Sequence, residues 1–216
     1  TYGVSVKELA AAYGVFANGG RYVKPHTYTK VIDNTGKLLL ENNPDSEKVL
    51  SEETAFIVTS LLTSVIEGKS GTGRVAKLSQ MPAAGKTGTT NNDNDKWFVG
   101  YTPYYVGAVW YGFDSPASIR NAGVTSNISA KIWGMVMENV HKDMSVKEFE
   151  EPVGVVKEAI CTKTGKLASS SCSYKSTEFF IRGTEPTKRC NQKHSGGKAE
   201  TSQNASEIAK PSASAD

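Results

Sequence analysis

Apolar residues recur at intervals of three or four in three segments of the chain, a spacing that predicts amphipathic helices. The first segment follows Ser5, and Glu8 three residues later completes the pattern of a capping box. The second begins at Ser51 with acidic residues in its first turn, where the helix dipole favours negative charge. The predicted helices therefore cover 6–16, 51–67 and 126–142.

Shorter apolar runs bounded by turn residues predict strands. Two of these runs flank Asp33-Asn34-Thr35-Gly36, which predicts a hairpin turn. Three later runs lie close enough in sequence to pair as an antiparallel meander. The predicted strands cover 28–32, 37–41, the stretch around Lys86, 97–101, 105–111 and 153–160. Together with the helices they predict an α+β fold, in which an antiparallel sheet is flanked by helices.

The length of 216 residues fits one domain of ordinary size or a domain with an appendage, and 38% hydrophobic residues suffice for a core. We predict a main unit at 1–148 and a small β-rich C-terminal extension at 149–198. Residues 199–216 lack hydrophobic periodicity and are predicted to be disordered. No run of about 18 apolar residues predicts a membrane span. The chain starts with Thr1 and has no signal peptide, so we expect a fragment or a processed piece.

The formal net charge of +3 is unevenly distributed, because five basic residues between 182 and 198 face one acidic residue. No basic surface interleaved with aromatic residues is evident, so no nucleic-acid partner is predicted. We interpret the basic run as a solvated segment.

Three cysteines, Cys161, Cys172 and Cys190, all lie in the last third of the chain. Their spacing fits no standard zinc pattern, and the histidines are scattered, so neither a metal nor another cofactor is predicted. In an oxidising compartment Cys161 and Cys172 could close a short loop and leave one thiol over. The alternatives are inert thiols, or a redox or metal role.

The richest chemistry in the sequence lies in Ala83-Ala84-Gly85-Lys86-Thr87-Gly88-Thr89-Thr90. Because side chains alternate in a strand, Lys86 and Gly88 should face one way and Thr87 and Thr89 the other. Gly88 leaves room for a ligand or another backbone to come close. As an edge strand, this stretch offers a charge, hydroxyls and unpaired N–H groups to an anionic, peptide-like ligand.

Gly-Lys-Thr also occurs in phosphate-binding loops, but that motif needs a glycine five residues before Gly85, where this chain has Gln80. A second Lys-Thr-Gly occurs at Lys163-Thr164-Gly165, next to Cys161 in a turn-like setting. We interpret this second copy as a chance match.

Several motifs resemble the bifunctional (class A) penicillin-binding proteins in order and spacing. They are Gly3-Val4-Ser5, Leu9-Ala10, Tyr13, Phe16-Ala17-Asn18-Gly19-Gly20, Gly71-Thr72-Gly73, Gly85-Lys86-Thr87-Gly88-Thr89 and Trp97-Phe98-Val99-Gly100-Tyr101-Thr102-Pro103. The resemblance covers roughly residues 1–145. It implies the C-terminal half of a transpeptidase domain with the β-lactamase/transpeptidase fold, so that this chain is only part of the domain.

The resemblance implies a peptidoglycan D,D-transpeptidase that is inhibited by β-lactams and works outside the bacterial cell membrane. Lys86, Thr87, Gly88 and Thr89 are then substrate-binding residues. Lys86 also contributes positive potential to catalysis, and the Thr89 backbone N–H serves the oxyanion hole. The expected partners are peptidoglycan stem peptides, β-lactams and the N-terminal half of the same protein, with a membrane anchor outside this chain.

The family also needs a Ser-x-x-Lys nucleophile box and a Ser-x-Asn box, both upstream of Lys-Thr-Gly. Here Ser195-Gly196-Gly197-Lys198 and Ser202-Gln203-Asn204 match those patterns, but after Lys86 and in or beside the predicted tail. A nucleophile needs a positioned base, so we expect the functional boxes before Thr1. A serine β-lactamase and a non-catalytic penicillin-sensing module remain alternatives.

Overall fold

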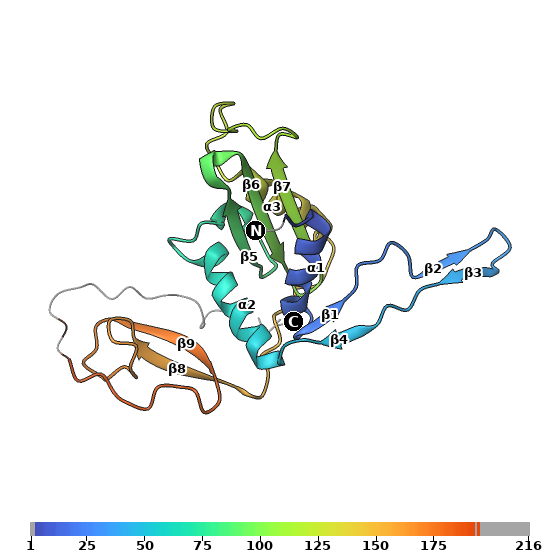
Figure 1. Cartoon of the computed structure of the whole chain (residues 1–216). Helices are drawn as coiled ribbons and strands as arrows, with labels where there is room; N and C mark the ends of the chain where they lie inside the picture. The colour runs from blue at the N-terminus through green and yellow to red at the C-terminus, as the bar shows by residue number, and fades with distance from the viewer. Residues whose placement is uncertain (1–2, 193, 195–216) are drawn as a thin grey trace, which may run out of the picture.

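A three-stranded antiparallel sheet with the strand order β5-β6-β7 lies between helices (Figure 1). Its strands are β5 (Ala84–Thr89), β6 (Asp95–Tyr101) and β7 (Val106–Gly112). The computed structural model describes residues 3–192 and 194. Within these residues β5 pairs with β6 alone and is therefore an edge strand, as the predicted meander requires.

The three predicted helices are present as α1 (Val6–Ala17), α2 (Glu52–Glu67) and α3 (Ile128–Val140). Figure 1 shows α1 and α3 on opposite sides of the sheet, and α2 beside β5. This arrangement confirms the predicted α+β fold, with an antiparallel sheet flanked by helices. None of the helices in the described part of the chain is long and apolar enough to cross a membrane.

Side-chain caps fix where the first two helices begin. Glu8 N–H donates to Ser5 Oγ at 3.2 Å, and Ser5 N–H donates to Glu8 Oε2 at 2.8 Å, which confirms the capping box. At α2, Thr54 N–H donates to Ser51 Oγ at 3.1 Å. Each cap satisfies backbone donors that have no partner within the helix.

The main core fills the space between the sheet and α3. Phe98 of β6 is fully buried and meets Trp133 of α3 edge to face, with ring centroids 5.3 Å apart. Trp133 Nε1–H donates to the Gly107 carbonyl at 3.1 Å. The other buried residues of this core are Ile66, Ala76, Leu78, Met81, Ala83, Ala130 and Met137.

Two short strand pairs between α1 and α2 form an arm that extends away from the helices (Figure 1). The predicted hairpin around Asp33–Gly36 is present as β2 (Lys30–Ile32) and β3 (Leu38–Glu41). At its base β1 (Arg21–Val23) pairs with β4 (Ser46–Lys48), which the sequence did not predict. Ser46-Glu47-Lys48 carries no apolar pattern. Besides the backbone pairing, the Arg21 guanidinium donates to Ser46 Oγ and to the Ser46 carbonyl, each at 2.8 Å.

The C-terminal unit is an antiparallel hairpin of β8 (Val155–Cys161) and β9 (Lys175–Ile181). The first of these strands was predicted and the second was not. Phe179 of β9 meets Phe56 of α2 edge to face at 5.1 Å, so the hairpin packs on that helix. The domain boundaries at 148 and 198 stay predictions, and the predicted tail at 199–216 lies outside the described residues.

The structure holds Cys161, Cys172 and Cys190 as free, buried thiols. The disulfide between Cys161 and Cys172, which was one of the sequence alternatives, is not formed. All three cysteines belong to one buried cluster in the β8–β9 unit.

Replacing Phe98 by Ala should lower the free energy of unfolding by about 3–5 kcal/mol, because it leaves a cavity against Trp133. Phe113→Ala is the matched control, since that ring is 49% exposed. Urea denaturation of the two variants measures the difference. Equal losses would show that the interface between α3 and the sheet is not the main core.

Candidate functional site

β5 is buried at its start and exposed at its end. Ala84 and Gly85 are buried, whereas Lys86 and Thr89 are exposed. A Cβ atom on Gly85 would lie 2.7 Å from the Phe98 ring, so only glycine lets β5 approach β6 this closely. The strand is thus anchored by its first residues and presents its last ones to solvent.

The register with β6 places the site's hydroxyls and its lysine on different faces. Thr87 is opposite Phe98, and Phe98 packs on α3, so the Thr87 side chain points to the α3 side. Thr89 lies two residues further and shares this face, whereas Lys86 points to the other one. Lys86 Nζ donates to the Thr87 carbonyl at 2.8 Å, which keeps the ammonium against the β5 backbone.

A third hydroxyl comes from the loop that follows α2. Thr72 Oγ1 lies 2.9 Å from Thr87 Oγ1, and Asn127 Nδ2 donates to the Thr72 carbonyl at 3.5 Å. In the structure Gly73 N–H donates to the Val65 carbonyl at 2.9 Å, which holds the loop on α2. Thr72 was not among the predicted site residues.

A second lysine lies beside Thr89. Lys96 Nζ is 3.3 Å from Thr89 Oγ1 and 2.6 Å from Asp93 Oδ1. The Lys96 side chain is only 13% exposed, so its charge is balanced within the protein by Asp93. Arg120 Nε donates to the other carboxylate oxygen of Asp93 at 2.9 Å.

The turn that joins β5 to β6 shapes this ion pair. Asn92 and Asp93 have φ angles of 62° and 51°, a left-handed conformation that Asn and Asp tolerate better than most residues. The hydrogen bond from Lys96 lowers the pKa of Asp93, and the nearby charge of Arg120 acts in the same direction. The carboxylate therefore stays ionised at neutral pH. Sequence reasoning missed Lys96, although the β5–β6 register puts it opposite Thr89.

The edge of β5 thus combines two cations, Lys86 and Lys96, with the hydroxyls of Thr72, Thr87 and Thr89. Charge-assisted hydrogen bonds from such groups are stronger than neutral ones and suit a carboxylate. An edge strand also offers backbone groups to an extended peptide. The residues gathered here can bind and polarise a ligand, but they form no pair of nucleophile and base.

The second Lys-Thr-Gly lies elsewhere. It forms the turn after β8, where Lys163 Nζ lies 4.7 Å from the centroid of the Tyr174 ring. The structure does not bring it to β5, and its interpretation as a chance match stays a prediction. The Ser195–Lys198 and Ser202–Asn204 patterns lie outside the described residues.

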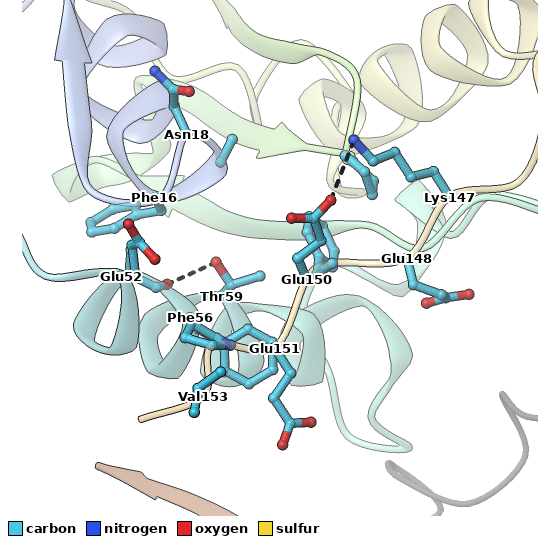
Figure 2. A pocket seen from close by; sticks show the side chains of 16 residues that line it. Phe16, Asn18, Glu52, Phe56, Thr59, Lys147, Glu148, Glu150, Glu151 and Val153 are labelled. Atoms are coloured by element: carbon cyan, nitrogen blue, oxygen red, sulfur yellow. Dashed lines mark hydrogen bonds and ion pairs between the residues drawn. The ribbon is translucent and has the colours of Figure 1, made fainter. Parts of the chain in front are cut away.

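A pocket of about 510 Å³ lies near the start of α2 (Figure 2), and Thr72, which follows the other end of this helix, does not line it. Because α2 has 16 residues and rises about 1.5 Å per residue, its two ends are roughly 24 Å apart. Four carboxylates, those of Glu52, Glu148, Glu150 and Glu151, line the pocket with one ammonium, that of Lys147. Their net negative charge disfavours an anionic ligand, so we place the candidate site at β5.

Two family descriptions match the chain. Residues 2–132 match "Penicillin binding protein transpeptidase domain", and residues 151–195 match "Penicillin-binding protein 1A, C-terminal domain". Residues 133–150, between the two matches, include the end of α3 and the segment that leads to β8.

Among known sequences, a penicillin-binding protein 1A of Clostridium tetani is 44% identical over 200 residues, 90% of this chain and 25% of the relative. Its namesake in Aquifex aeolicus is 36% identical, over 88% of this chain and 26% of the relative. The chain thus spans about a quarter of the length of these relatives.

Among solved structures, penicillin-binding protein 1A of Haemophilus influenzae superposes with a TM-score of 0.75 at 28% identity, over 87% of this chain and 33% of that one. The penicillin-binding protein PonA1 of Mycobacterium tuberculosis gives a TM-score of 0.60 at 27% identity, over 68% of this chain and 41% of that one.

Asp93→Asn should make the protein less stable at pH 7, because Lys96 then loses its ionised partner. The hydrogen bond from Lys96 lowers the folded-state pKa of Asp93 below its ordinary value, so the stabilisation is present above that ordinary pKa and is lost as the pH falls through the folded-state pKa. The stability difference from the parent should therefore close in acid. Urea unfolding at several pH values tests this, with the exposed Asp143→Asn as control. A difference that persists below the folded pKa would contradict the ion-pair explanation.

Proposed function

Because the chain belongs to the penicillin-binding proteins, whose transpeptidase domain it matches over residues 2–132, we propose that it is part of a peptidoglycan D,D-transpeptidase. The complete protein cross-links stem peptides by acyl transfer from D-Ala-D-Ala through a serine acyl-enzyme, and β-lactams inhibit it. This chain supplies the Lys86-Thr87-Gly88-Thr89 clamp that binds the substrate's terminal carboxylate.

The observation that carries this proposal is the cationic, hydroxyl-lined edge of β5. A peptide ending in D-Ala-D-Ala has an amide carbonyl next to a carboxylate, and it can lie along an edge strand in an extended conformation. The Thr87 and Thr89 hydroxyls donate to the carboxylate. Lys86 and Lys96 supply the positive potential, and Thr72 orients the Thr87 hydroxyl from 2.9 Å away.

In the reaction, the serine oxygen attacks the carbonyl of the penultimate D-Ala, and the terminal D-Ala leaves as its amide bond breaks. The amine of a second stem peptide then attacks the acyl ester and releases the serine. A lysine near the serine, or the serine of the second box, transfers the protons. The Thr89 backbone N–H stabilises the oxyanion, a role typically worth about 3–4 kcal/mol in the transition state.

The serine and its lysine lie outside the 216 residues, on the N-terminal half of the same protein. That half also covers apolar surface of α1 and supplies the remaining wall of the site. The complete protein is anchored in the cell membrane and acts on its outer face, where stem peptides are exposed.

The rate of deacylation separates this function from its alternatives. A transpeptidase keeps a long-lived penicillin adduct, whereas a serine β-lactamase hydrolyses it rapidly. A penicillin sensor also keeps the adduct but does not cross-link lipid-linked peptidoglycan. Both measurements require the longer protein that contains the nucleophile.

Replacing Thr87 and Thr89 together by Val should slow acylation by penicillin at least tenfold. Valine keeps the shape but removes two hydrogen bonds to a charged group, each worth about 1.5–3 kcal/mol. Stopped-flow or gel-based acylation rates of the longer protein measure the effect. Thr177→Val, on the exposed face of β9, is the control and should leave the rate unchanged. An unaltered acylation rate in the double variant would contradict the proposal that these two hydroxyls bind the carboxylate.

Lys86→Ala should impair acylation much more than Lys163→Ala. Both lysines start a Lys-Thr-Gly, but Lys86 lies on the β5 edge, whereas Lys163 stacks on Tyr174 in the β8–β9 unit. Acylation rates of the two variants, measured side by side, make the comparison. Equal losses of acylation rate in the two variants would contradict the assignment of the functional Lys-Thr-Gly to β5.

A further inference from the structure

The C-terminal β8–β9 unit has almost no apolar interior of its own. Its buried residues within the described part of the chain are Val155, Cys161, Cys172 and Cys190. Val155 lies at the opposite end of the hairpin from Cys161, which is the last residue of β8. The cysteine end is therefore built around sulfur atoms instead of packed aliphatic groups. Units of this size usually need disulfides or a metal for stability.

The imidazole of His194 lies close to the three cysteine sulfurs. The ligand atoms of Cys161, Cys172, Cys190 and His194 all lie within 4.8 Å of one another. His194 Nε2 is 3.2 Å from the Cys161 sulfur and 3.3 Å from the Cys190 sulfur. In a tetrahedral zinc site with bonds of about 2.3 Å to sulfur and about 2.0 Å to nitrogen, ligand atoms are about 3.5–3.8 Å apart. The observed cluster needs only small side-chain shifts to surround one ion.

The backbone around each cysteine is held in place. Cys161 N–H donates to the Lys166 carbonyl at 2.7 Å, and Cys190 N–H donates to the Leu167 carbonyl at 2.8 Å. Cys172 N–H donates to a carbonyl three residues earlier at 3.1 Å. The cysteines thus come from three segments that the unit's own hydrogen bonds bring together, a preorganised arrangement for a shared ion.

A neighbouring aromatic ring holds the histidine of the cluster in place. The ring of His194 stands edge-on to the Tyr174 ring at 5.8 Å, which fixes the imidazole plane.

We propose that Cys161, Cys172, Cys190 and His194 form a closed, structural zinc site. On binding, the three thiols release their protons to water and the imidazole binds as the neutral base. Four protein ligands fill the tetrahedron and leave no position for a substrate, which makes the site structural and not catalytic. A single disulfide would use two of the four groups and give no reason for the positions of the other two.

This proposal replaces the sequence-based prediction that the chain holds no metal. That prediction relied on the long spacings between the cysteines, which differ from common zinc motifs. The hairpin brings the two distant segments back to Cys161, so spacing along the chain was a poor guide.

The first test is the metal content of the full chain, purified under reducing conditions after incubation with zinc and desalting. Mass spectrometry of the metal should find one zinc ion per chain. Cys172→Ser and His194→Ala should each lower the retained zinc at least tenfold, whereas His194→Cys should retain it through a fourth thiolate. His26→Ala, an exposed histidine on the arm, is the control and should keep one zinc ion. Absence of zinc from the parent chain, or full zinc in Cys172→Ser, would overturn the proposal.

A second test uses only the parent chain, so it does not depend on whether a variant folds. Native alkylation should label all three cysteines at least tenfold more slowly in the presence of zinc than after its removal by a chelator. Cobalt in place of zinc should give the charge-transfer absorption of thiolate ligands. Equal alkylation rates with and without zinc, or a disulfide between two of the cysteines in the purified protein, would contradict the site.

Discussion

The pairing of β5 with β6 is the interaction on which the candidate site depends. β5 has no other strand partner in the described part of the chain, so its position is set by β6. β6 in turn is fixed by Phe98, which is buried against Trp133 of α3. The small Gly85 lets the two strands approach under the Phe98 ring. The six residues of β5 thus combine a buried start, which packs against β6, with an exposed end.

The two lysines of the candidate site differ in exposure and in their charged partners. Lys86 is exposed to solvent, whereas Lys96 is nearly buried and is held by Asp93. A buried ammonium needs such a partner, because its desolvation is otherwise costly. The ion pair fixes the position of the Lys96 ammonium, 3.3 Å from Thr89 Oγ1, before any ligand arrives. Preorganised charge of this kind is what a site for a developing oxyanion or a carboxylate requires.

The local part of this architecture could be predicted from the sequence. Helix periodicity, the cap at Ser5 and the composition around Lys86 act over a few residues, and the structure agrees with them. The resemblance to penicillin-binding proteins likewise rested on contiguous motifs, and the family matches confirm it. The sequence did not predict the two contacts that depend on how the chain folds back. Thr72 contacts Thr87 from 15 residues earlier in the chain, and Lys96 lies opposite Thr89 because of the strand register.

Contacts in the C-terminal β8–β9 unit were even harder to predict from the sequence. The β9 strand has only a weak pattern, and the cluster of three cysteines with His194 depends on how the hairpin closes. The hydrophobic periodicity of the sequence does not indicate how β8 and β9 pair. Because this unit packs on α2 through Phe179 and Phe56, its folding also affects the helix that leads to Thr72. A metal in the small unit would therefore stabilise one support of the site without taking part in the reaction.

We propose that the ligand binds at the edge of β5 that has no strand partner in the described part of the chain. Amide hydrogen exchange of the longer protein, compared with and without a bound β-lactam, tests it directly. We expect amides at the end of β5, Thr89 above all, to exchange at least tenfold more slowly in the adduct, while the exchange rates of β9 amides do not change. Protection elsewhere with β5 unaffected would contradict the account.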